Sequence, residues 1–193
     1  MPGLPPLRVG SVNPENKSQI TSGFKDLSPS SIRYRFSAVK KEVTPQELQY
    51  FTEVDGQDHY ALGIEERGGK GRGIAVVRLV RSTTDQHEAE VAVTIIDEYQ
   101  RRGLGTLLIN LIILAALERD LTQLSFTYMP QNLGIKKLLN KVGQPVKGQI
   151  NHNSVQVYLM LKEFAVDEMK TRLKENLPVI EEFSIFNQDS SLQ

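Results

Sequence analysis

The chain has 193 residues, a length that fits one compact domain with some additional tail. With 39% hydrophobic and 24% charged residues, its composition is typical of a globular protein and not of a disordered or membrane-embedded one. The 23 basic residues balance the 23 acidic residues, so no overall charge attracts nucleic acid or anionic lipid. We therefore expect neither a nucleic-acid nor a membrane partner, and any anion-binding site must be local.

Cysteine and histidine usage narrows the chemistry further. Cysteine is absent, which excludes disulfides, thiolate catalysis and cysteine-ligated metal sites. His59, His87 and His152 lie far apart with no metal-ligand spacing, so no metal is expected. The N-terminus has no apolar run of signal-peptide length, and the longest apolar stretch, 107–117, is too short to span a bilayer. These features predict a cytoplasmic protein.

The first third of the chain carries one strand signal and two helix starts. Residues 7–12 are typical of an edge strand. Asn13-Pro14 combines an N-cap residue with proline at the first helical position, and predicts a helix that ends at Leu27, before Pro29. Thr44-Pro45 repeats this signal, and Glu47 stands at the capping-box position.

The pattern then changes to strands. Residues 59–66 and 73–82 are extended and β-branched, and the glycine-rich connection 68–73 between them predicts a hairpin. A third strand is expected over 88–96, because its residues alternate between two faces. Glu90, Ala92, Thr94 and Ile96 share one of these faces.

The second half alternates helices and strands. A helix over 103–119 is apolar on almost every side, so we expect it to be buried against a sheet. The elements that follow are a strand at 123–128, a helix at 132–141, a hairpin of 145–150 with 154–161, and from 165 an amphipathic helix with a polar tail. This order predicts an α/β (α+β) fold with a mixed sheet flanked by helices. The order alone carries no function.

The segment that carries chemistry is the loop between strand 88–96 and the following helix. Its two glycines, Gly103 and Gly105, allow several backbone N–H groups to converge at the positive end of the helix dipole. A Cβ at either position would hold a diphosphate away from the backbone, and Arg101 and Arg102 add positive charge. A phosphate-bearing ligand is the functional interpretation, and a plain strand-to-helix turn with solvated arginines is the alternative. A dinucleotide site would need a third glycine where Leu108 stands.

These residues resemble a known family. Gln100-x-x-Gly103-x-Gly105 matches the Q/R-x-x-G-x-G/A signature of the GCN5-related N-acetyltransferases (GNAT), and residues 132–143 resemble that family's second cofactor motif. The stretch 27–36, LSPSSIRYRF, and Ala89-Glu90 resemble the bacterial protein lysine acetyltransferases called Pat. Pat enzymes usually carry this domain attached to a cyclic-nucleotide-binding or acyl-CoA-synthetase-like domain, and neither is present in this sequence.

The resemblance implies a GNAT fold with a mostly antiparallel central sheet that splays at the acyl-CoA site. It assigns residues 6–162 to the acyltransferase domain and leaves 163–193 as a C-terminal helix and polar tail. The implied activity is acetyl-CoA-dependent transfer of an acetyl group to an amine, with a protein lysine as the preferred acceptor. A small-molecule amine and a non-catalytic CoA-binding module are the alternatives. Monomer and homodimer both remain open.

The resemblance also implies roles for individual residues. A lysine amine is protonated at pH 7 and needs a base before it can attack a thioester, and Glu90 matches the base of Pat-like enzymes. A solvated strand-end carboxylate is the alternative role for Glu90, and a helix cap is the alternative for Asn132. The residues expected to bind the cofactor are Thr94, Ile95, Ile96, Gln100, Arg101, Arg102, Gly103, Leu104, Gly105, Thr106 and Asn132.

One position departs from the family pattern. Many GNAT enzymes place a tyrosine seven residues after the motif asparagine, where it protonates the departing thiolate, and this chain has Leu139 there. Tyr128 or Tyr99 could substitute, although packing is the alternative role for both. If the resemblance to Pat extends to the acceptor, Tyr34 and Arg35 line the acceptor side.

Overall fold

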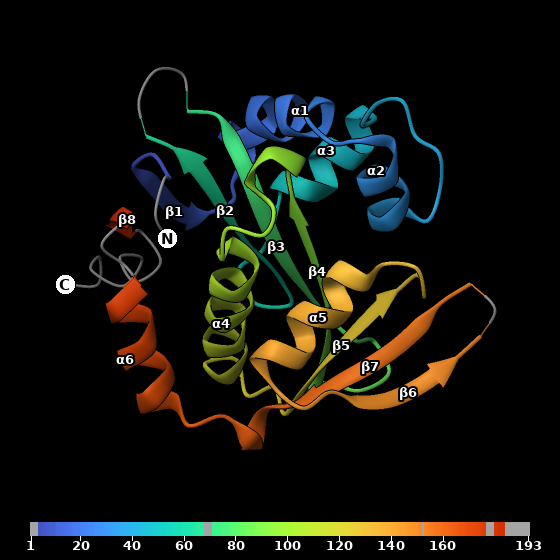
Figure 1. The fold of residues 1–193 in the computed structure, drawn as a ribbon, viewed down its shortest axis with the longest axis vertical. Helices are drawn as coiled ribbons and strands as arrows, with labels where there is room; N and C mark the ends of the chain where they lie inside the picture. The colour runs from blue at the N-terminus through green and yellow to red at the C-terminus, as the bar shows by residue number, and fades with distance from the viewer. Residues whose placement is uncertain (1–3, 68–70, 152, 177–179, 184–193) are drawn as a thin grey trace.

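The computed structural model describes residues 4–67, 71–151, 153–176 and 180–183 (Figure 1). Residues 68–70 of the predicted glycine-rich connection, His152 and the tail end 184–193 lie outside the described residues. None of the helices within the described ranges is long and apolar enough to cross a bilayer. The same ranges contain no group of three or more His, Cys, Asp or Glu side chains that could hold a metal ion.

One mixed sheet forms the centre of the molecule. Its strand order is β6-β7-β5-β4-β3-β2-β1-β8, and the pairs β4–β5 and β1–β8 are parallel while the others are antiparallel. The fold class expected from the order of elements is therefore confirmed. The strands are β1 (Leu7–Ser11), β2 (His59–Glu66), β3 (Gly73–Arg81), β4 (Glu88–Ile95), β5 (Gln123–Tyr128), β6 (Val146–Ile150), β7 (Val155–Met160) and β8 (Ile180–Phe183).

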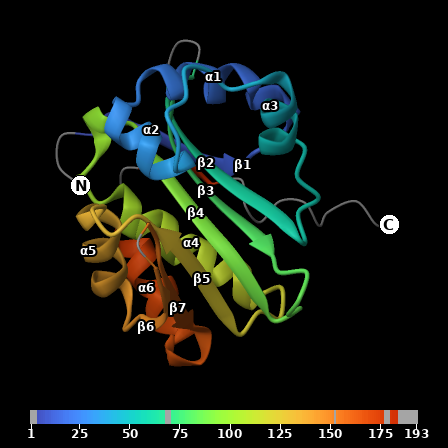
Figure 2. The same cartoon turned by 90° about the vertical axis from the view of Figure 1, so that its right-hand side faces the viewer.

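Helices cover both faces of this sheet. The helices α1, α2 and α3 form one layer, and α4 and α5 lie over the opposite face, as the two perpendicular views show (Figures 1 and 2). The short 3₁₀ segments η1, η2 and η3 are Pro14–Asn16, Asp97–Tyr99 and Leu161–Glu163. The helices are α1 (Lys17–Lys25), α2 (Pro29–Phe36), α3 (Pro45–Thr52), α4 (Leu104–Leu117), α5 (Leu133–Val142) and α6 (Val166–Asn176).

The hydrophobic core is built around α4. Every residue of this helix except Thr106, Asn110 and Leu117 is buried, as its apolar sequence predicts. The helix contacts β3, β4, α5 and α6, so burial of its apolar surface holds the central strands and the C-terminal helix together. Its position also fixes the loop that precedes it, because that loop connects β4 to the first turn of α4.

The structure differs from the expected elements in two places, between α1 and α2 and near the C-terminus. The helix predicted from Asn13 to Leu27 ends at Lys25, and a further helix, α2, begins at Pro29. The Ser28 hydroxyl caps α2 by accepting a hydrogen bond from the Ser31 N–H at 3.2 Å, so Pro29 starts a helix as well as following one. Near the C-terminus β8 pairs in parallel with β1, where the sequence predicts only a polar tail.

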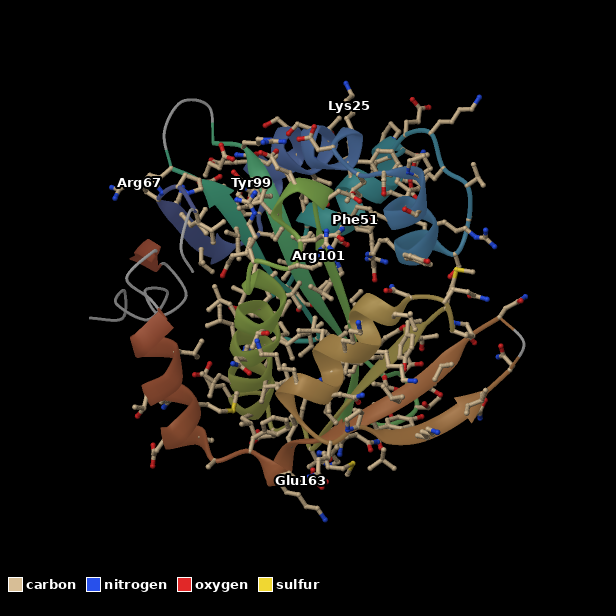
Figure 3. All side chains as sticks on the ribbon, viewed as in Figure 1. Lys25, Phe51, Arg67, Tyr99, Arg101 and Glu163 are labelled. Atoms are coloured by element: carbon tan, nitrogen blue, oxygen red, sulfur yellow. The ribbon has the colours of Figure 1, made fainter. Side chains whose placement is uncertain are left out.

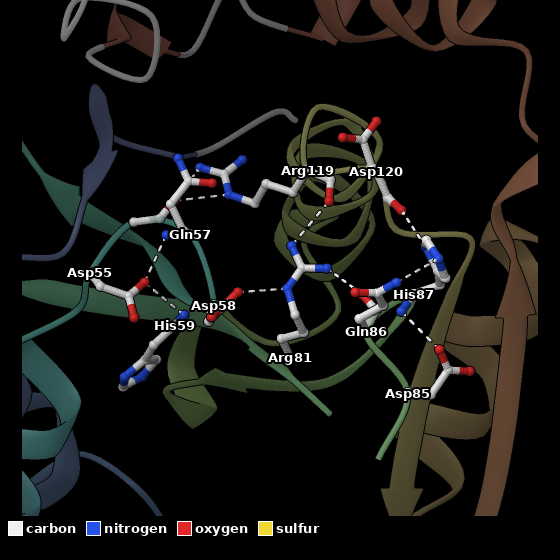
Figure 4. Close-up of polar contacts among 11 residues, drawn as sticks. Asp55, Gln57, Asp58, His59, Arg81, Asp85, Gln86, His87, Arg119 and Asp120 are labelled. Carbon is white, nitrogen blue, oxygen red and sulfur yellow. Dashed lines mark hydrogen bonds and ion pairs between the residues drawn. The ribbon is translucent and has the colours of Figure 1, made fainter. Parts of the chain in front are cut away.

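A polar network closes the end of the sheet where β3 stops (Figure 4). Arg81 donates hydrogen bonds to the Asp58 carboxylate at 2.6 Å, to the Gln86 carbonyl and to the Arg119 carbonyl at 3.0 Å. His87 contacts the Asp120 carbonyl at 3.2 Å. One guanidinium thus connects the turn before β2, the turn before β4 and the end of α4, which fixes β4 at the end opposite its loop.

Candidate functional site

The site begins where the parallel strands β4 and β5 separate. Their register pairs Glu88 to Glu90 with Gln123 to Ser125 and goes no further, although β4 continues to Ile95 and β5 to Tyr128. Beyond Glu90 each strand stays paired with its other neighbour, β4 with β3 and β5 with β7. The two halves of the sheet therefore diverge, and beyond Glu90 the backbone of β4 has no strand partner on the β5 side. This is the splayed sheet that the resemblance predicts.

A cleft of about 1070 Å³ occupies the gap. Residues of α2 and α3 form one wall, those of β5 and α5 form the other, and β4 lies between them (Figure 2). Arg101 of the loop and Phe51 of α3, which both line this cleft, are labelled near the centre of Figure 3. The expected site residues that line the cleft are Glu90, Thr94, Ile95, Gln100, Arg101, Gly103, Gly105, Thr106 and Asn132.

Three of the expected residues do not line it. The side chains of Ile96 and Leu104 are buried in the core. The Ile96 N–H donates to the Ile74 carbonyl at 3.0 Å and the Ile96 carbonyl accepts from the Tyr99 N–H at 2.9 Å, so of these two residues Leu104 alone has a backbone N–H available to a ligand. The Arg102 guanidinium lies over the Tyr99 ring, 5.3 Å from its centroid. The structure therefore gives Arg102 a stacking contact outside the cleft, where the sequence predicts a cofactor contact.

The loop between β4 and α4 presents free backbone donors. Arg101 and Gly103 have positive φ values of 60° and 93°, and α4 starts at Leu104 without a side-chain cap. The Leu107 N–H is the first to bond within the helix, to the Gly103 carbonyl at 3.1 Å. Within the described part of the chain nothing accepts from the N–H groups of residues 104–106. These groups and the helix dipole form a site for an anion such as a diphosphate.

The Gln100 side chain holds this loop in place. Its amide donates to the Ile95 carbonyl at 3.0 Å and to the Ser31 hydroxyl at 3.2 Å, which connects the loop to both β4 and α2. The Asp97 carboxylate accepts from the Ser28 N–H at 2.9 Å and from the hydroxyls of Ser28 and Ser31 at 2.7 and 3.1 Å. Burial acts to raise the pKa of Asp97, and these hydrogen bonds lower it below its usual value. The serines of the 27–36 stretch therefore dock α2 against the loop.

The two glycines of the motif are needed for different physical reasons. Gly103 adopts a backbone conformation that disfavours a side chain. Gly105 is buried, and a Cβ there would lie 2.9 Å from Cδ2 of Leu138 and 3.5 Å from Cδ1 of Ile95. The sequence-based explanation, that both glycines leave room for a diphosphate, is thus incomplete, because Gly105 allows α4 to pack closely against α5.

Glu90 lies where the strands separate. Its carboxylate is exposed and lines the cleft, and it is the last residue of β4 that pairs with β5. Glu88, on the same face of β4, instead accepts a hydrogen bond from the Gln123 amide at 2.9 Å and does not line the cleft. The two carboxylates are therefore distinct, and Glu90 is the one that a bound molecule can reach.

Asn132 caps a helix and also lies at the cleft. Its Oδ1 caps α5 by accepting from the Ile135 N–H at 3.2 Å, and the residue also lines the cleft. On the same helix Lys137 and Lys141 line the cleft and are exposed. Their spacing of four places them on one helical face, so Arg101 is not the sole basic residue at the site. The charge and spacing of these lysines are visible in the sequence, but which wall they face is not.

The candidate tyrosines differ in whether they line the cleft. Leu139, at the position of the family's tyrosine, is fully buried and does not line the cleft. Tyr99 is buried and donates a hydrogen bond to the Glu66 carboxylate, also outside the cleft. Tyr128 lines the cleft, and burial raises the pKa of its hydroxyl. Tyr34 lines it too, and its hydroxyl donates to the Gln131 carbonyl at 3.4 Å across the cleft.

Comparisons with known proteins agree with this geometry. A family model described as an acetyltransferase (GNAT) domain matches residues 25–144. Acetyltransferase Pat of Mycolicibacterium smegmatis is 31% identical over 132 residues, which are 68% of this chain and 39% of that protein. The chain thus spans about two fifths of the length of this relative.

Solved structures extend the comparison. The crystal structure of the GNAT domain of S. lividans PAT has a TM-score of 0.73 at 25% identity, over 80% of this chain and 90% of that one. A cAMP-binding acyltransferase from Mycobacterium smegmatis has a TM-score of 0.59 at 25% identity, over 90% of this chain and 49% of that one. The likeness thus covers most of this chain.

The close packing at Gly105 yields a stability prediction. We expect Gly105→Ala to lower the free energy of unfolding by about 1–3 kcal/mol, the usual cost of overpacking, because the added methyl group overlaps the Leu138 side chain. Gly134→Ala in α5 is the matched control, since a Cβ there meets only the Asn132 Oδ1 at 3.4 Å, and it should leave stability unchanged or higher. Urea unfolding of the variants measures both effects. Equal midpoints for wild type and Gly105→Ala would contradict the packing role.

Proposed function

The chain belongs to the GNAT acetyltransferase family, whose members use acetyl-CoA, and from this premise we propose that it transfers an acetyl group from acetyl-CoA to an amine, preferably the side chain of a protein lysine. We further propose residues 6–162 as the acyltransferase domain and a cytoplasmic location. In the remaining segment α6 packs against α4 and β8 pairs with β1, so this part of the chain supports the domain's sheet and core.

One observation carries the proposal: a single cleft connects an anion site to a carboxylate. It runs from the free N–H groups at the start of α4, along the unpaired side of β4, to Glu90. At about 3.3 Å per residue, the five steps along the strand from Glu90 to Ile95 span about 17 Å. This arrangement suits an extended cosubstrate, with its diphosphate at the loop and its thioester near Glu90.

We assign the cofactor contacts accordingly. The backbone N–H groups of 104–106 hold the diphosphate, with Arg101 and the lysines of α5 adding positive charge. Thr94 and Ile95 meet the pantetheine arm, and Asn132 lies on the opposite wall. Ile96, for which the resemblance implies the same contact, has both backbone groups bonded within the protein. Gln100 contributes to cofactor binding indirectly, because its two hydrogen bonds maintain the shape of the loop.

The reaction is a direct transfer. Glu90 removes a proton from the acceptor ammonium, directly or through a water, because a lysine with a pKa of about 10.4 is almost fully protonated at pH 7. The neutral nitrogen attacks the thioester carbonyl carbon and a C–N bond forms. The C–S bond breaks, the CoA thiolate leaves, and the nitrogen loses its second proton to water, which gives the neutral amide. Backbone N–H groups of β4 on the side that β5 leaves free can stabilise the developing oxyanion.

Tyr128 is the residue we assign to protonate the thiolate. Burial raises its pKa, which keeps the hydroxyl protonated at neutral pH, and the residue lines the cleft on the β5 wall. Leu139 cannot take this role, because its side chain is apolar and buried.

Two alternatives make different predictions. A small-molecule amine as acceptor would leave label only in metabolites when a lysate is incubated with labelled acetyl-CoA, whereas a lysine acceptor would give labelled proteins in mass spectrometry. A non-catalytic CoA-binding module is favoured by the leucine at position 139. It predicts binding of acetyl-CoA without transfer to any amine.

Removal of the proposed base tests the mechanism. We expect Glu90→Gln to lower kcat at least about 100-fold while acetyl-CoA still binds, since loss of a general base typically costs 100- to 10,000-fold. The defect should shrink as the pH rises toward the pKa of the amine, because more acceptor is then already neutral. Glu88→Gln is the control, and its activity should match wild type because Glu88 faces Gln123 and not the cleft. A Glu90→Gln enzyme as active as wild type would contradict the assignment of Glu90 as the base.

Loss of the Tyr128 hydroxyl tests the proton donor. Tyr128→Phe keeps the ring and should lower kcat by about 100-fold, the lower end of general-acid effects. Tyr158→Phe on β7 removes a hydroxyl outside the cleft and should change little. Initial rates at saturating acetyl-CoA compare the two variants. Full activity of Tyr128→Phe would mean that the thiolate leaves unprotonated or takes its proton from water.

A further inference from the structure

Two arginines lie at the Glu90 end of the cleft. Arg35 of α2 and Arg78 of β3, together called the arginine pair below, both line it. In the β3–β4 register Arg78 is opposite Ala92, so it lies diagonal to Glu90 on the same face of the sheet. Diagonal positions of this kind are about 7–8 Å apart, within the reach of long side chains.

Protein groups satisfy only part of the hydrogen-bonding capacity of the arginine pair. Arg78, with 5% of its surface exposed, donates to the Phe51 carbonyl at 2.6 Å and to the His59 ring. The Arg35 guanidinium lies over the rings of Phe36 and Phe51, at 5.2 and 6.0 Å, and in the described chain it donates no hydrogen bond. A guanidinium has five N–H donors, so several of them remain available.

The arginine pair also lacks carboxylate partners. Within the described residues no carboxylate oxygen comes within 4.0 Å of either guanidinium. Other arginines of this chain are paired, Arg72 with Asp26 and Glu98, and Arg81 with Asp58. Among the carboxylates that line the cleft, Glu47 pairs with Lys40. Asp97 accepts hydrogen bonds from Ser28 and Ser31. Glu90 is the one that acts on the charge of Arg35.

Burial and the charge of Arg35 on Arg78 act against the charged forms of the arginine pair. Burial lowers the pKa of Arg35, with Glu90 and Tyr50 acting in the opposite direction. Burial, followed by the charge of Arg35, lowers the pKa of Arg78 to about 10. Buried charges are normally paired or hydrogen-bonded, because desolvation without compensation is costly. An anion delivered from the cleft would supply the missing compensation.

The cosubstrate's phosphates are not that anion. Arg78 stands at the level of Ala92, and the diphosphate loop follows Ile96, four residues or about 13 Å further along β4. Glu90 marks the opposite end, where the amine must be deprotonated. The arginine pair therefore belongs to the acceptor half of the cleft.

We propose that the arginine pair binds a carboxylate of the acceptor that lies close to the reactive amine. This inference rests on the proposed acetyltransferase function. Arginine binds carboxylates through two parallel charge-assisted hydrogen bonds. Such a contact orients the amine of the acceptor and also raises the affinity for the acceptor. The carboxylate has two possible sources, an acidic side chain next to the target lysine or the acid group of a small amino compound.

Matched acceptors test the proposal. Two lysine peptides that differ only by Glu or Gln next to the lysine address the first source, and 4-aminobutyrate against butylamine addresses the second. We expect kcat/KM to be about 10- to 100-fold higher for the charged acceptor in at least one comparison, the range for hydrogen bonds to a charged group. The comparison that shows the preference identifies the source. No preference in either overturns the proposal.

Substitutions in α2 test whether Arg35 causes the preference for the charged acceptor. In Arg35→Gln the ratio between charged and uncharged acceptor should fall to about one to threefold. Arg33→Gln, which removes an exposed arginine of the same helix outside the cleft, should keep the wild-type ratio. If Arg35→Gln lowers activity on both acceptors equally and keeps the ratio, Arg35 is structural and the proposal fails.

A binding measurement tests the carboxylate site without depending on acetyl transfer. Fluorescence anisotropy of the two labelled peptides in the presence of CoA reports the same preference without turnover. If no amine is acetylated, the proposed function fails, and a higher affinity for the Glu peptide that Arg35→Gln abolishes still supports the carboxylate site. Equal affinities for the two peptides, together with equal competition by 4-aminobutyrate and butylamine, overturn that site.

Discussion

The divergence of β4 from β5 after the Glu90–Ser125 pair is the constraint on which the site depends. Parallel strands normally continue to exchange hydrogen bonds, and here each strand keeps a full antiparallel partner on its other side. The sheet therefore remains stable while it opens in the middle. The opening frees backbone groups of β4 and places Glu90 at its closed end and the α4 loop at its wide end.

Contacts between distant segments maintain the cleft. Asp97 and Gln100 bind the serines of α2, and Tyr34 reaches the Gln131 carbonyl on the opposite wall. The helix that carries Arg35 is thus docked directly on the loop that presents the anion site. At the far end Arg81 joins the turns around β2 and β4 to the end of α4. Both ends of β4 are consequently fixed, as an extended bound molecule requires.

Much of this architecture is predictable from residue patterns. The strand at 59–66, the buried helix after Gly103 and the mixed sheet follow from β-branched runs, glycine positions and apolar periodicity. Local signals do not reveal which wall a side chain faces, so Lys137, Lys141 and Arg78 emerge only from the tertiary arrangement.

The unpredicted features have physical causes. Pro29 predicts the end of one helix, and the hydrogen bond from the Ser31 N–H to the Ser28 hydroxyl shows that a second helix starts there. The contacts of Ser28 with Asp97, which is distant in sequence, hold that helix in place. The strand β8 forms through pairing with β1, which is distant in sequence. The need for glycine at 105 comes from Leu138 on another helix.

We propose that the loop between β4 and α4 holds acetyl-CoA, and thermal unfolding with and without this compound, with NAD and ATP as controls, is the decisive experiment. A ligand at about 100 times its dissociation constant stabilises the folded state by roughly 2.7 kcal/mol. For a chain of this size the unfolding midpoint should rise by about 5–10 °C with acetyl-CoA alone. An unchanged midpoint at saturating acetyl-CoA would contradict the claim, because the loop would then be only a strand-to-helix turn.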